Sequence, residues 1–290
     1  MNGVLLGVYE KALITPSDWP SFFAQVREAG FDFVDLSIDE SPHRAQRLDW
    51  TLDECRQVRQ AAESHDVAIG GLCLSLHRRV MPGSCNPVVR AEAADVFRRA
   101  IDLARHLGTG VVQVAGYYAY YEEADPEARP RYLDTVLSAV PYAARSGIIL
   151  GIENVDGNDL ASVSDVMEVV RLARSPWLQC YPDIGNIALA GADAATDLAL
   201  AQSHIVAVHV KDVRAGEPRR VRFGTGIAEV DKAFAELARQ DWSGRLMLEM
   251  WHDDDPNSIE MSIAERRYIE DRLAVAGLQI ASPRSHDGTR

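Results

Sequence analysis

Eight short apolar segments recur along the chain and alternate with segments of helical character. Most of the eight are nearly continuous in apolar and β-branched residues, which is typical of strands buried on both faces in a parallel sheet. Segments 20–30, 93–108 and 231–240 lie between them and carry apolar residues at helical spacing. We expect the strands at residues 4–10, 31–38, 67–76, 110–116, 148–154, 178–186, 205–210 and 245–251.

Eight alternations in one chain predict an α/β fold, a (β/α)8 TIM barrel. An open doubly wound sheet is the alternative, but the glycine-rich fingerprint GxGxxG of dinucleotide-binding sheets is absent. The composition shows no linker before residue 281, so residues 1–280 are expected to form a single barrel domain. The polar tail at 281–290 contains Pro and Gly and is predicted to be disordered.

Charge and apolar content narrow the class of protein. A net charge of −13 repels phosphodiester backbones, which argues against a nucleic-acid partner. No apolar run approaches the roughly 20 residues needed to cross a bilayer, and the N-terminus lacks the pattern of a signal peptide. We therefore expect a cytoplasmic protein without membrane contact. The four cysteines are widely spaced and form no CxxC pair, so neither disulfides nor a thiolate metal site are expected.

Four of the expected strands end in side chains that can bind a metal. Glu153 ends the fifth strand, Asp183 the sixth, His209 the seventh and Glu249 the eighth, each about one βα unit after the last. In a barrel the C-terminal strand ends converge on one pocket. Three carboxylates and one imidazole suit a divalent ion such as Mn²⁺, Mg²⁺, Co²⁺ or Zn²⁺. A histidine in an apolar strand is commonly a core residue, but this register predicts a metal ligand.

Longer motifs carry a family resemblance. The segments that carry it are GVYEKAL (7–13), FDFVDLSIDE (31–40), RLDW (47–50), CLSLHRR (73–79), QVAGYYAYYEEA (113–124), YPDIGN (181–186), HIVAVHVKD (204–212), FGTG (223–226) and LEMW (248–251). Through these segments the chain resembles the L-ribulose-5-phosphate 3-epimerases, also described as L-xylulose-5-phosphate 3-epimerases, which belong to the xylose-isomerase-like TIM barrels. The resemblance extends from residue 3 to about residue 277.

By this resemblance, the family's metal ligands fall on the same four residues that the spacing selects. It implies one divalent ion and the C3 epimerisation of a ketose 5-phosphate, L-xylulose 5-phosphate to L-ribulose 5-phosphate, in L-ascorbate degradation. Glu153 and Glu249 would transfer protons through a metal-bound cis-enediolate, while Asp183 and His209 would only hold the ion. The resemblance also favours a homodimer. The sequence departs from the family at Asn154, where a methionine is common.

Further polar residues near the strand ends are candidates for contacts with a small phosphorylated ketose. Ser75, His77 and Asn186 could bind sugar hydroxyls, and Asp156 is carried over from the family as a substrate or supporting contact. Asp212 could orient neighbouring groups. Tyr117, Tyr118, Tyr120 and Tyr121 could close over the sugar or pack a subunit interface. The cationic side chains near the strand ends could bind the phosphate or simply be solvated, and backbone N–H groups of FGTG could add to a phosphate site. These cations are Lys11, Arg78, Arg79, Lys211 and Arg222.

Three other functions fit parts of the pattern. An aldose–ketose or hydroxypyruvate-type isomerase on the same barrel would share the ligands and the enediolate chemistry. An endonuclease-IV-like metallo-phosphodiesterase would need more histidines and a basic face, which a chain of charge −13 does not offer. A non-catalytic sugar-phosphate sensor is disfavoured because both candidate bases are intact.

Overall fold

The computed structural model describes residues 3–281, and in it the eight expected strands form one parallel sheet. The strands are β1 (Leu5–Tyr9), β2 (Phe33–Ile38), β3 (Ala68–Leu74), β4 (Val111–Ala115), β5 (Ile149–Glu153), β6 (Leu178–Cys180), β7 (Val208–Val210) and β10 (Arg245–Leu248). Their order is β6-β5-β4-β3-β2-β1-β10-β7. The predicted TIM barrel is therefore confirmed.

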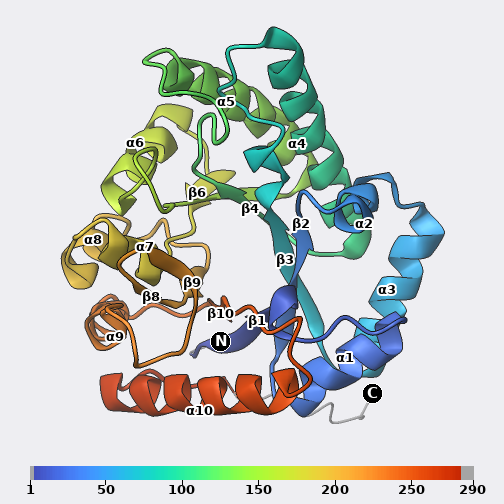
Figure 1. Ribbon diagram of the computed structural model, residues 1–290, viewed down its shortest axis with the longest axis vertical. Helices are drawn as coiled ribbons and strands as arrows, with labels where there is room; N and C mark the ends of the chain where they lie inside the picture. Colours follow the sequence, from blue (N-terminus) through green and yellow to red (C-terminus); the bar gives the residue numbers. More distant parts are fainter. Residues whose placement is uncertain (1–2, 282–290) are drawn as a thin grey trace.

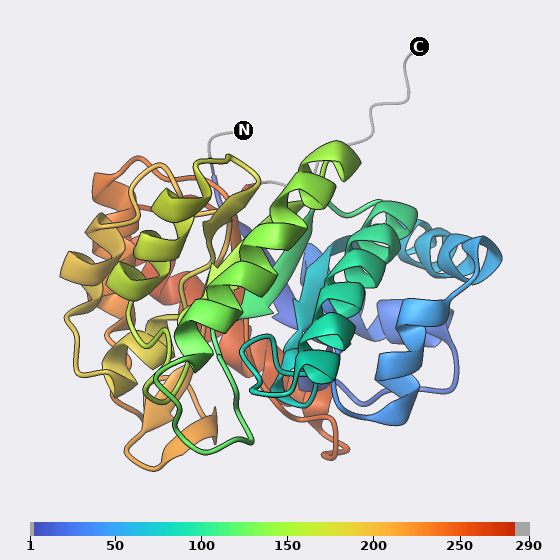
Figure 2. The same ribbon diagram turned by 90° about the horizontal axis from the view of Figure 1, so that it is seen from above.

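Helices surround this sheet on the outside (Figure 1). Figure 2 shows the same molecule from above, with the long helices α4 and α5 packed against each other. The helices are α1 (Trp19–Glu28), α2 (Pro42–Ala45), α3 (Leu52–Ser64), α4 (Pro87–Leu107), α5 (Ala128–Ser146), α6 (Val163–Ala173), α7 (Ile184–Leu189), α8 (Ala194–Ala199), α9 (Val230–Arg239) and α10 (Ser258–Ala276), with 3₁₀ turns η1 (Glu10–Ala12), η2 (Gln46–Asp49) and η3 (Ser75–Arg78).

The last strand pair closes the barrel in an irregular way. Ladders of paired residues join the other neighbours, but within residues 3–281 only isolated parallel bridges link β6 and β7, Cys180 with Ile205 and Asp183 with His209. Backbone hydrogen bonds support this junction, since the N–H of Val206 donates to Cys180 O at 3.0 Å and that of His209 to Pro182 O at 2.9 Å. Two of the four predicted metal ligands thus lie directly on the junction.

The side chains on the two faces of each strand have different surroundings. Along β5, Leu150 and Ile152 belong to the large hydrophobic core that includes side chains of the helices. The alternate positions, such as Gly151, face the inside of the barrel. The side chains there include buried polar ones such as Asp35 and Gln113. Because successive side chains point to opposite faces of a strand, Glu153 lies on the inward side, two residues after Gly151.

The ring of Phe33, at the start of β2, lies against a glycine of each neighbouring strand, β1 and β3. A Cβ added to Gly7 would lie 2.1 Å from the Phe33 ring, and one added to Gly70 would lie 2.2 Å from it. We expect Gly7→Ala to lower the free energy of unfolding by about 1–3 kcal/mol, because the added methyl group would force the buried Phe33 ring to shift. Urea unfolding measures the change. Gly110→Ala is the control, since a Cβ there meets nothing within 4 Å; equal stability of the two variants would refute the steric argument.

The structure differs from the predictions in two places. The strand expected at 178–186 ends at Cys180, and α7 begins at Ile184, because Asp183 caps this helix by accepting the N–H of Asn186. A two-stranded hairpin follows β7, formed by β8 (Asp212–Arg214) and β9 (Glu217–Val221), and was not anticipated. Of the tail predicted at 281–290, only Ala281 lies within the described residues, and its N–H donates to Val4 O.

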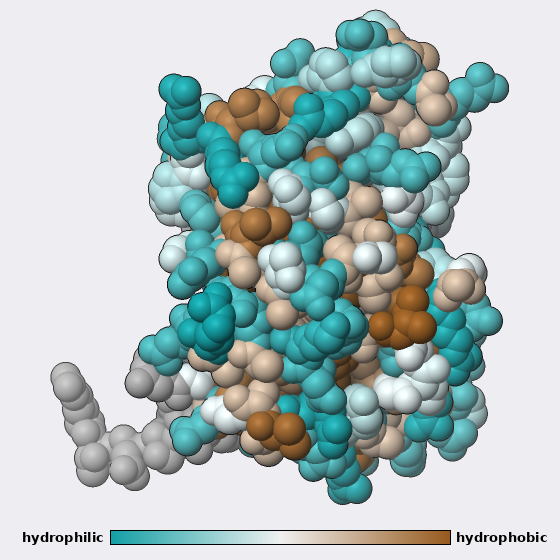
Figure 3. Space-filling view, turned by 90° about the vertical axis from the view of Figure 1, so that its left-hand side faces the viewer, coloured by the Kyte–Doolittle hydropathy of each residue, from teal (hydrophilic) through white to brown (hydrophobic). Residues whose placement is uncertain are grey.

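The surface of the helix layer is mixed in character. On the face shown in Figure 3, hydrophobic side chains lie in small groups between hydrophilic ones, as is usual for the outer side of helices that cover a sheet. Among the described residues no helix is both long enough and apolar enough to cross a membrane.

Candidate active site

The four predicted metal ligands meet at the C-terminal ends of β5, β6, β7 and β10. Glu153, Asp183, His209 and Glu249 each offer one ligand atom, and these atoms all lie within 4.8 Å of one another. Three of the residues are buried, and the side chain of Glu249 is 13% exposed. The group is therefore compact and faces solvent through one member.

An amide network fixes the aspartate at the end of β6. Asn154 accepts the N–H of Asp183 at 2.7 Å through Oδ1 and donates from Nδ2 to the Asp183 carbonyl at 3.1 Å. Asn186 donates from Nδ2 to the Asn154 carbonyl at 2.9 Å. The Asp183 carboxylate is held in turn, because its Oδ1 accepts the Asn186 N–H at 2.8 Å. These contacts give Asn154 and Asn186 a positioning role that the sequence did not reveal.

Charge within the cluster is only partly balanced. The imidazole Nδ1 of His209 lies 2.7 Å from Glu153 Oε1. Lys211 Nζ lies 2.9 Å from Asp183 Oδ2 and 3.2 Å from Glu249 Oε2. Asp183 Oδ2 and Glu249 Oε2 are nevertheless buried atoms without a well-aligned hydrogen bond in the described part of the chain. These two carboxylate oxygens thus face the Lys211 ammonium without an aligned hydrogen bond.

These surroundings shift the pKa of each group. Burial alone would lower the pKa of His209, but the Glu153, Glu249 and Asp183 carboxylates raise it to about 9. Burial raises the pKa of Asp183, and the neighbouring glutamates add to this, although Lys211 opposes it. Burial also acts to raise the pKa of Glu249, but Lys211 and His209 outweigh it and lower the pKa. Carboxylates that compete for one ammonium would be stabilised together by a dication.

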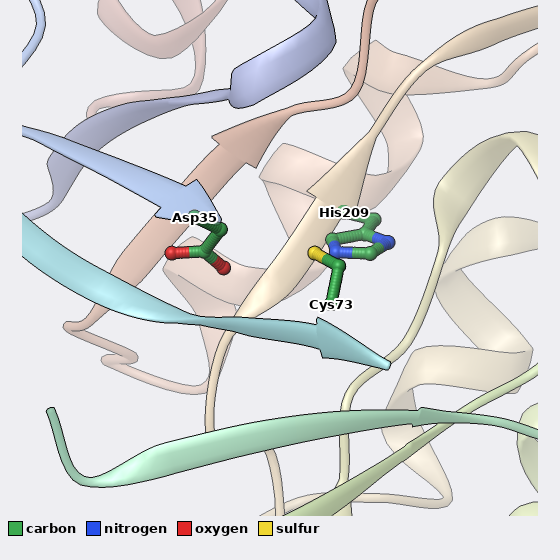
Figure 4. Close-up of side chains that lie close together, drawn as sticks. All are labelled: Asp35, Cys73 and His209. Atoms are coloured by element: carbon green, nitrogen blue, oxygen red, sulfur yellow. The ribbon is translucent and has the colours of Figure 1, made fainter. Parts of the chain in front are cut away.

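A second group lies beneath the imidazole, inside the barrel. Figure 4 shows Asp35 from β2 and Cys73 from β3 beside His209, and their ligand-type atoms lie within 4.8 Å of one another. Asp35 Oδ2 accepts the hydroxyl of Tyr181 at 3.0 Å, and the Tyr181 ring packs edge-on against the imidazole with the ring centroids 4.4 Å apart. This packing holds the His209 ring from below.

A cavity opens above the cluster and contains most of the predicted substrate contacts. Its walls include both glutamates and six of the eight predicted substrate-binding residues, namely Lys11, Ser75, Arg78, Asp156, Asn186 and Lys211. Trp251 and Tyr9 form an apolar wall, with their rings 6.0 Å apart. Lys211 lies within the group of metal ligands, between Asp183 and Glu249, although the sequence predicted that it contacts the phosphate.

The other two predicted substrate-binding residues lie elsewhere. His77 is buried against Phe97 of α4 and bonds to the Ala93 carbonyl at 3.2 Å. In a 3₁₀ turn residues three apart share a face, so Ser75 and Arg78 line the cavity while His77 points away from it. Arg222 donates to Glu265 Oε1 at 3.1 Å, outside the cavity.

Most of the remaining candidates also lie away from the cavity. Arg79 is exposed and does not line it. Asp212, expected to orient neighbouring groups, instead accepts the backbone N–H groups of Val213, Gly226 and Ala228, so it holds the loop after the hairpin. Of the four tyrosines, Tyr117 lines the cavity, and its hydroxyl donates to Asp156. The ring of Tyr118 packs against Tyr132 of α5.

The cavity residues that the sequence did not predict include Gln113 and Arg219. Gln113 donates from Nε2 to Glu153 Oε2 at 2.5 Å; the signal was a single polar residue in the middle of the apolar segment 110–116. Arg219 lines the cavity from β9. No signal marked it, because the hairpin itself was not recognised.

Comparisons with known proteins agree with this geometry. A family model described as the xylose isomerase-like TIM barrel matches residues 23–272. L-ribulose-5-phosphate 3-epimerase UlaE of Salmonella heidelberg (strain SL476) is 36% identical over 273 residues, which cover 94% of this chain and 96% of the relative. The protein of the same name from Salmonella paratyphi C (strain RKS4594) matches equally, with 36% identity and the same coverage.

Solved structures share the fold at low identity. An L-ribulose 3-epimerase has a TM-score of 0.79 and 17% identity, covering 94% of this chain and 96% of that one. A D-allulose 3-epimerase from Methylomonas sp., solved with D-allulose, has a TM-score of 0.76 and 16% identity, covering 94% and 98%.

Proposed function

The chain belongs to the xylose isomerase-like TIM barrels and, within them, to the L-ribulose-5-phosphate 3-epimerase family, and from this premise we propose that it interconverts L-xylulose 5-phosphate and L-ribulose 5-phosphate with the help of one divalent ion. It is an epimerase of the isomerase class. The observation that carries the finer proposal is the buried group of three carboxylates and one imidazole beneath the cavity. A homodimer and a cytoplasmic location belong to the same proposal, and light scattering would test the first.

The residues present suit a divalent ion. Glu153, Asp183, His209 and Glu249 would hold it, since their ligand atoms lie together and two carboxylate oxygens lack an aligned hydrogen bond. Oxygen and imidazole ligands fit Mn²⁺, Mg²⁺, Co²⁺ or Zn²⁺. When bound, such an ion supplies Lewis-acid stabilisation of the negative charge that develops beside C3.

The two glutamates can serve the two faces of C3. Epimerisation removes the proton next to the C2 carbonyl and returns one to the opposite side, so it needs two groups that exchange protons. Glu153 and Glu249 both line the cavity, and β6 and β7 lie between their strands around the barrel. One glutamate would accept the C3 proton as a carboxylate while the other, protonated, donates its own; the roles reverse in the back reaction.

Neighbouring groups orient these glutamates differently. Glu153 accepts hydrogen bonds on both oxygens, from Gln113 at 2.5 Å and from the protonated form of His209 at 2.7 Å. Glu249 has the ammonium of Lys211 at 3.2 Å and keeps part of its side chain exposed to the cavity. Both carboxylates are thus held in place before the substrate binds, which reduces the cost of reaching the reactive geometry.

The proposed function is tested by incubating the purified protein with a panel of ketose phosphates in deuterated water, with and without a chelator. We expect L-ribulose 5-phosphate from L-xylulose 5-phosphate, deuterium at C3, and loss of turnover with the chelator that added Mn²⁺ restores. An aldose product would instead support an aldose–ketose isomerase. Full turnover in the chelator would contradict the role of the ion.

Metal uptake is expected to release at least one proton per site at pH 7, because the pKa values of two ligands, His209 and Asp183, are raised. His209 has a pKa raised to about 9, so it carries a proton at pH 7, whereas a metal ligand must be the neutral imidazole. Metal affinity should therefore rise with pH up to about 9, where this proton is already lost. Calorimetric titration with Mn²⁺ in PIPES and in Tris, whose ionisation enthalpies differ, measures the release. Identical heats in the two buffers would refute it.

A further inference from the structure

We propose that Arg78 and Arg219 together bind the substrate's phosphate and make the enzyme selective for phosphorylated ketoses; this inference rests on the proposed function. Four cationic side chains line the cavity, Lys11, Arg78, Lys211 and Arg219. A phosphate dianion that enters a protein of net charge −13 needs local positive charge. The question is which of the four cations are available to it.

The two lysines are already neutralised by close carboxylates. Lys11 Nζ lies 2.5 Å from Asp39 Oδ2. Lys211 Nζ lies 2.9 Å from Asp183 and 3.2 Å from Glu249. A phosphate that contacted either ammonium would also approach these carboxylates, which repel it. The lysines are therefore poor candidates.

The two arginines have much weaker acidic partners. Arg219 Nη2 lies 3.6 Å from Asp156 Oδ1, and Arg78 Nε lies 4.0 Å from Glu40 Oε2, which also accepts the Tyr121 hydroxyl. Within residues 3–281 neither guanidinium makes a hydrogen bond, and Arg78 Nε is a buried donor without a partner. An unsatisfied buried N–H is costly, and Arg78 lines the cavity, so a ligand bound there can complete this donor.

A chain of contacts through two aromatic rings connects the two guanidiniums. Arg78 lies over the ring of Tyr120, at 5.8 Å from its centroid, and the Tyr120 and Tyr117 rings lie 4.7 Å apart. The Tyr117 hydroxyl donates to Asp156, the residue that also faces Arg219. These contacts connect η3 with the β8–β9 hairpin, and both arginines line the same cavity. We therefore infer that one phosphate reaches both guanidiniums.

Guanidinium chemistry suits this task. Arginine stays protonated and presents a planar fork that binds two phosphate oxygens at once. Asp156 occupies one edge of Arg219, and a guanidinium has five N–H donors, so others remain for the ligand. The side chains of Arg78 and Arg219 are 19% and 34% exposed, which leaves them open to the cavity while limiting their movement.

The test compares kcat/KM for L-xylulose 5-phosphate and unphosphorylated L-xylulose in Arg78→Gln, Arg219→Gln and Arg219→Lys. We expect the preference of the wild type for the phosphorylated ketose to fall by at least about tenfold in each Gln variant, the loss expected for one charge-assisted contact. The inhibition constant of inorganic phosphate should rise in parallel. Arg219→Lys should recover only part, because it restores the charge without the fork. Arg79→Gln and Arg222→Gln are controls, since both residues lie outside the cavity.

Two outcomes would overturn the inference in distinguishable ways. A wild type that prefers the phosphorylated ketose, with that preference unchanged in both Gln variants, would refute the arginine site alone. A wild type without any preference would refute the phosphorylated substrate of the proposed function, and the site with it. Thermal unfolding of each variant confirms that it is folded.

Discussion

Replacing either glutamate at the cavity with glutamine should reduce kcat by about 10²–10⁴-fold, the usual contribution of a positioned acid or base. Glu153 and Glu249 line the cavity and follow β5 and β10, which are the outer members of the neighbouring strands β5, β6, β7 and β10. Each glutamate is needed once per epimerisation. Glutamine keeps the shape and an oxygen ligand but cannot accept or return the proton. Steady-state kinetics on L-xylulose 5-phosphate, with metal content measured in parallel, gives the effect.

Hydrogen exchange sharpens this prediction. A variant that keeps one carboxylate can still remove the C3 proton from one epimer, so deuterium should enter that epimer without inversion. Glu153→Gln and Glu249→Gln should therefore exchange different epimers. Glu260→Gln, an exposed change in α10, serves as the control. The two-base mechanism would be refuted if both variants exchanged the same epimer or either kept full turnover.

Asp183→Asn should weaken binding of the divalent ion by at least about 100-fold, the upper end of the loss seen when only a supporting residue is changed. Asp183 is fully buried at the centre of the cluster, and its Oδ2 lacks an aligned hydrogen bond. Asparagine removes the ligand charge yet can still cap α7, because its amide oxygen accepts the same N–H. The fold should therefore survive while turnover at trace metal is lost.

Metal content after dialysis and titration with Mn²⁺ measure this loss. Asp193→Asn is the matched control, because Asp193 also caps a helix, α8, but is exposed and remote from the cluster. Unchanged metal affinity in Asp183→Asn would remove Asp183 from the ligand set.

The sequence predicted the features that depend on strand periodicity. The four strand-end residues Glu153, Asp183, His209 and Glu249 could be found because parallel strands in a barrel bring equivalent positions to one level. Their meeting in space was therefore expected before any coordinates.

Other features depend on local geometry that the residue pattern does not specify. The 3₁₀ turn η3 rotates His77 away from the cavity although it lies between Ser75 and Arg78. Arg222 and Arg219 are three residues apart, but only Arg219 lines the cavity, because the β8–β9 hairpin determines their directions. Lys211 could be placed near the site, but its position between two ligand carboxylates follows from tertiary packing alone.

The irregular junction between β6 and β7 has a consequence for the mechanics of the barrel. All other neighbouring strands share ladders, whereas this pair has isolated bridges, one of them between Asp183 and His209. An ion that binds both residues would cross-link β6 and β7 at the one junction of the barrel that has no ladder among the described residues. A ligand present at 100 times its Kd adds about 2.7 kcal/mol to stability. Here the ion would stabilise the β6–β7 junction in particular. The backbone amides of Val206 and His209 should therefore exchange with solvent more slowly once the ion is bound.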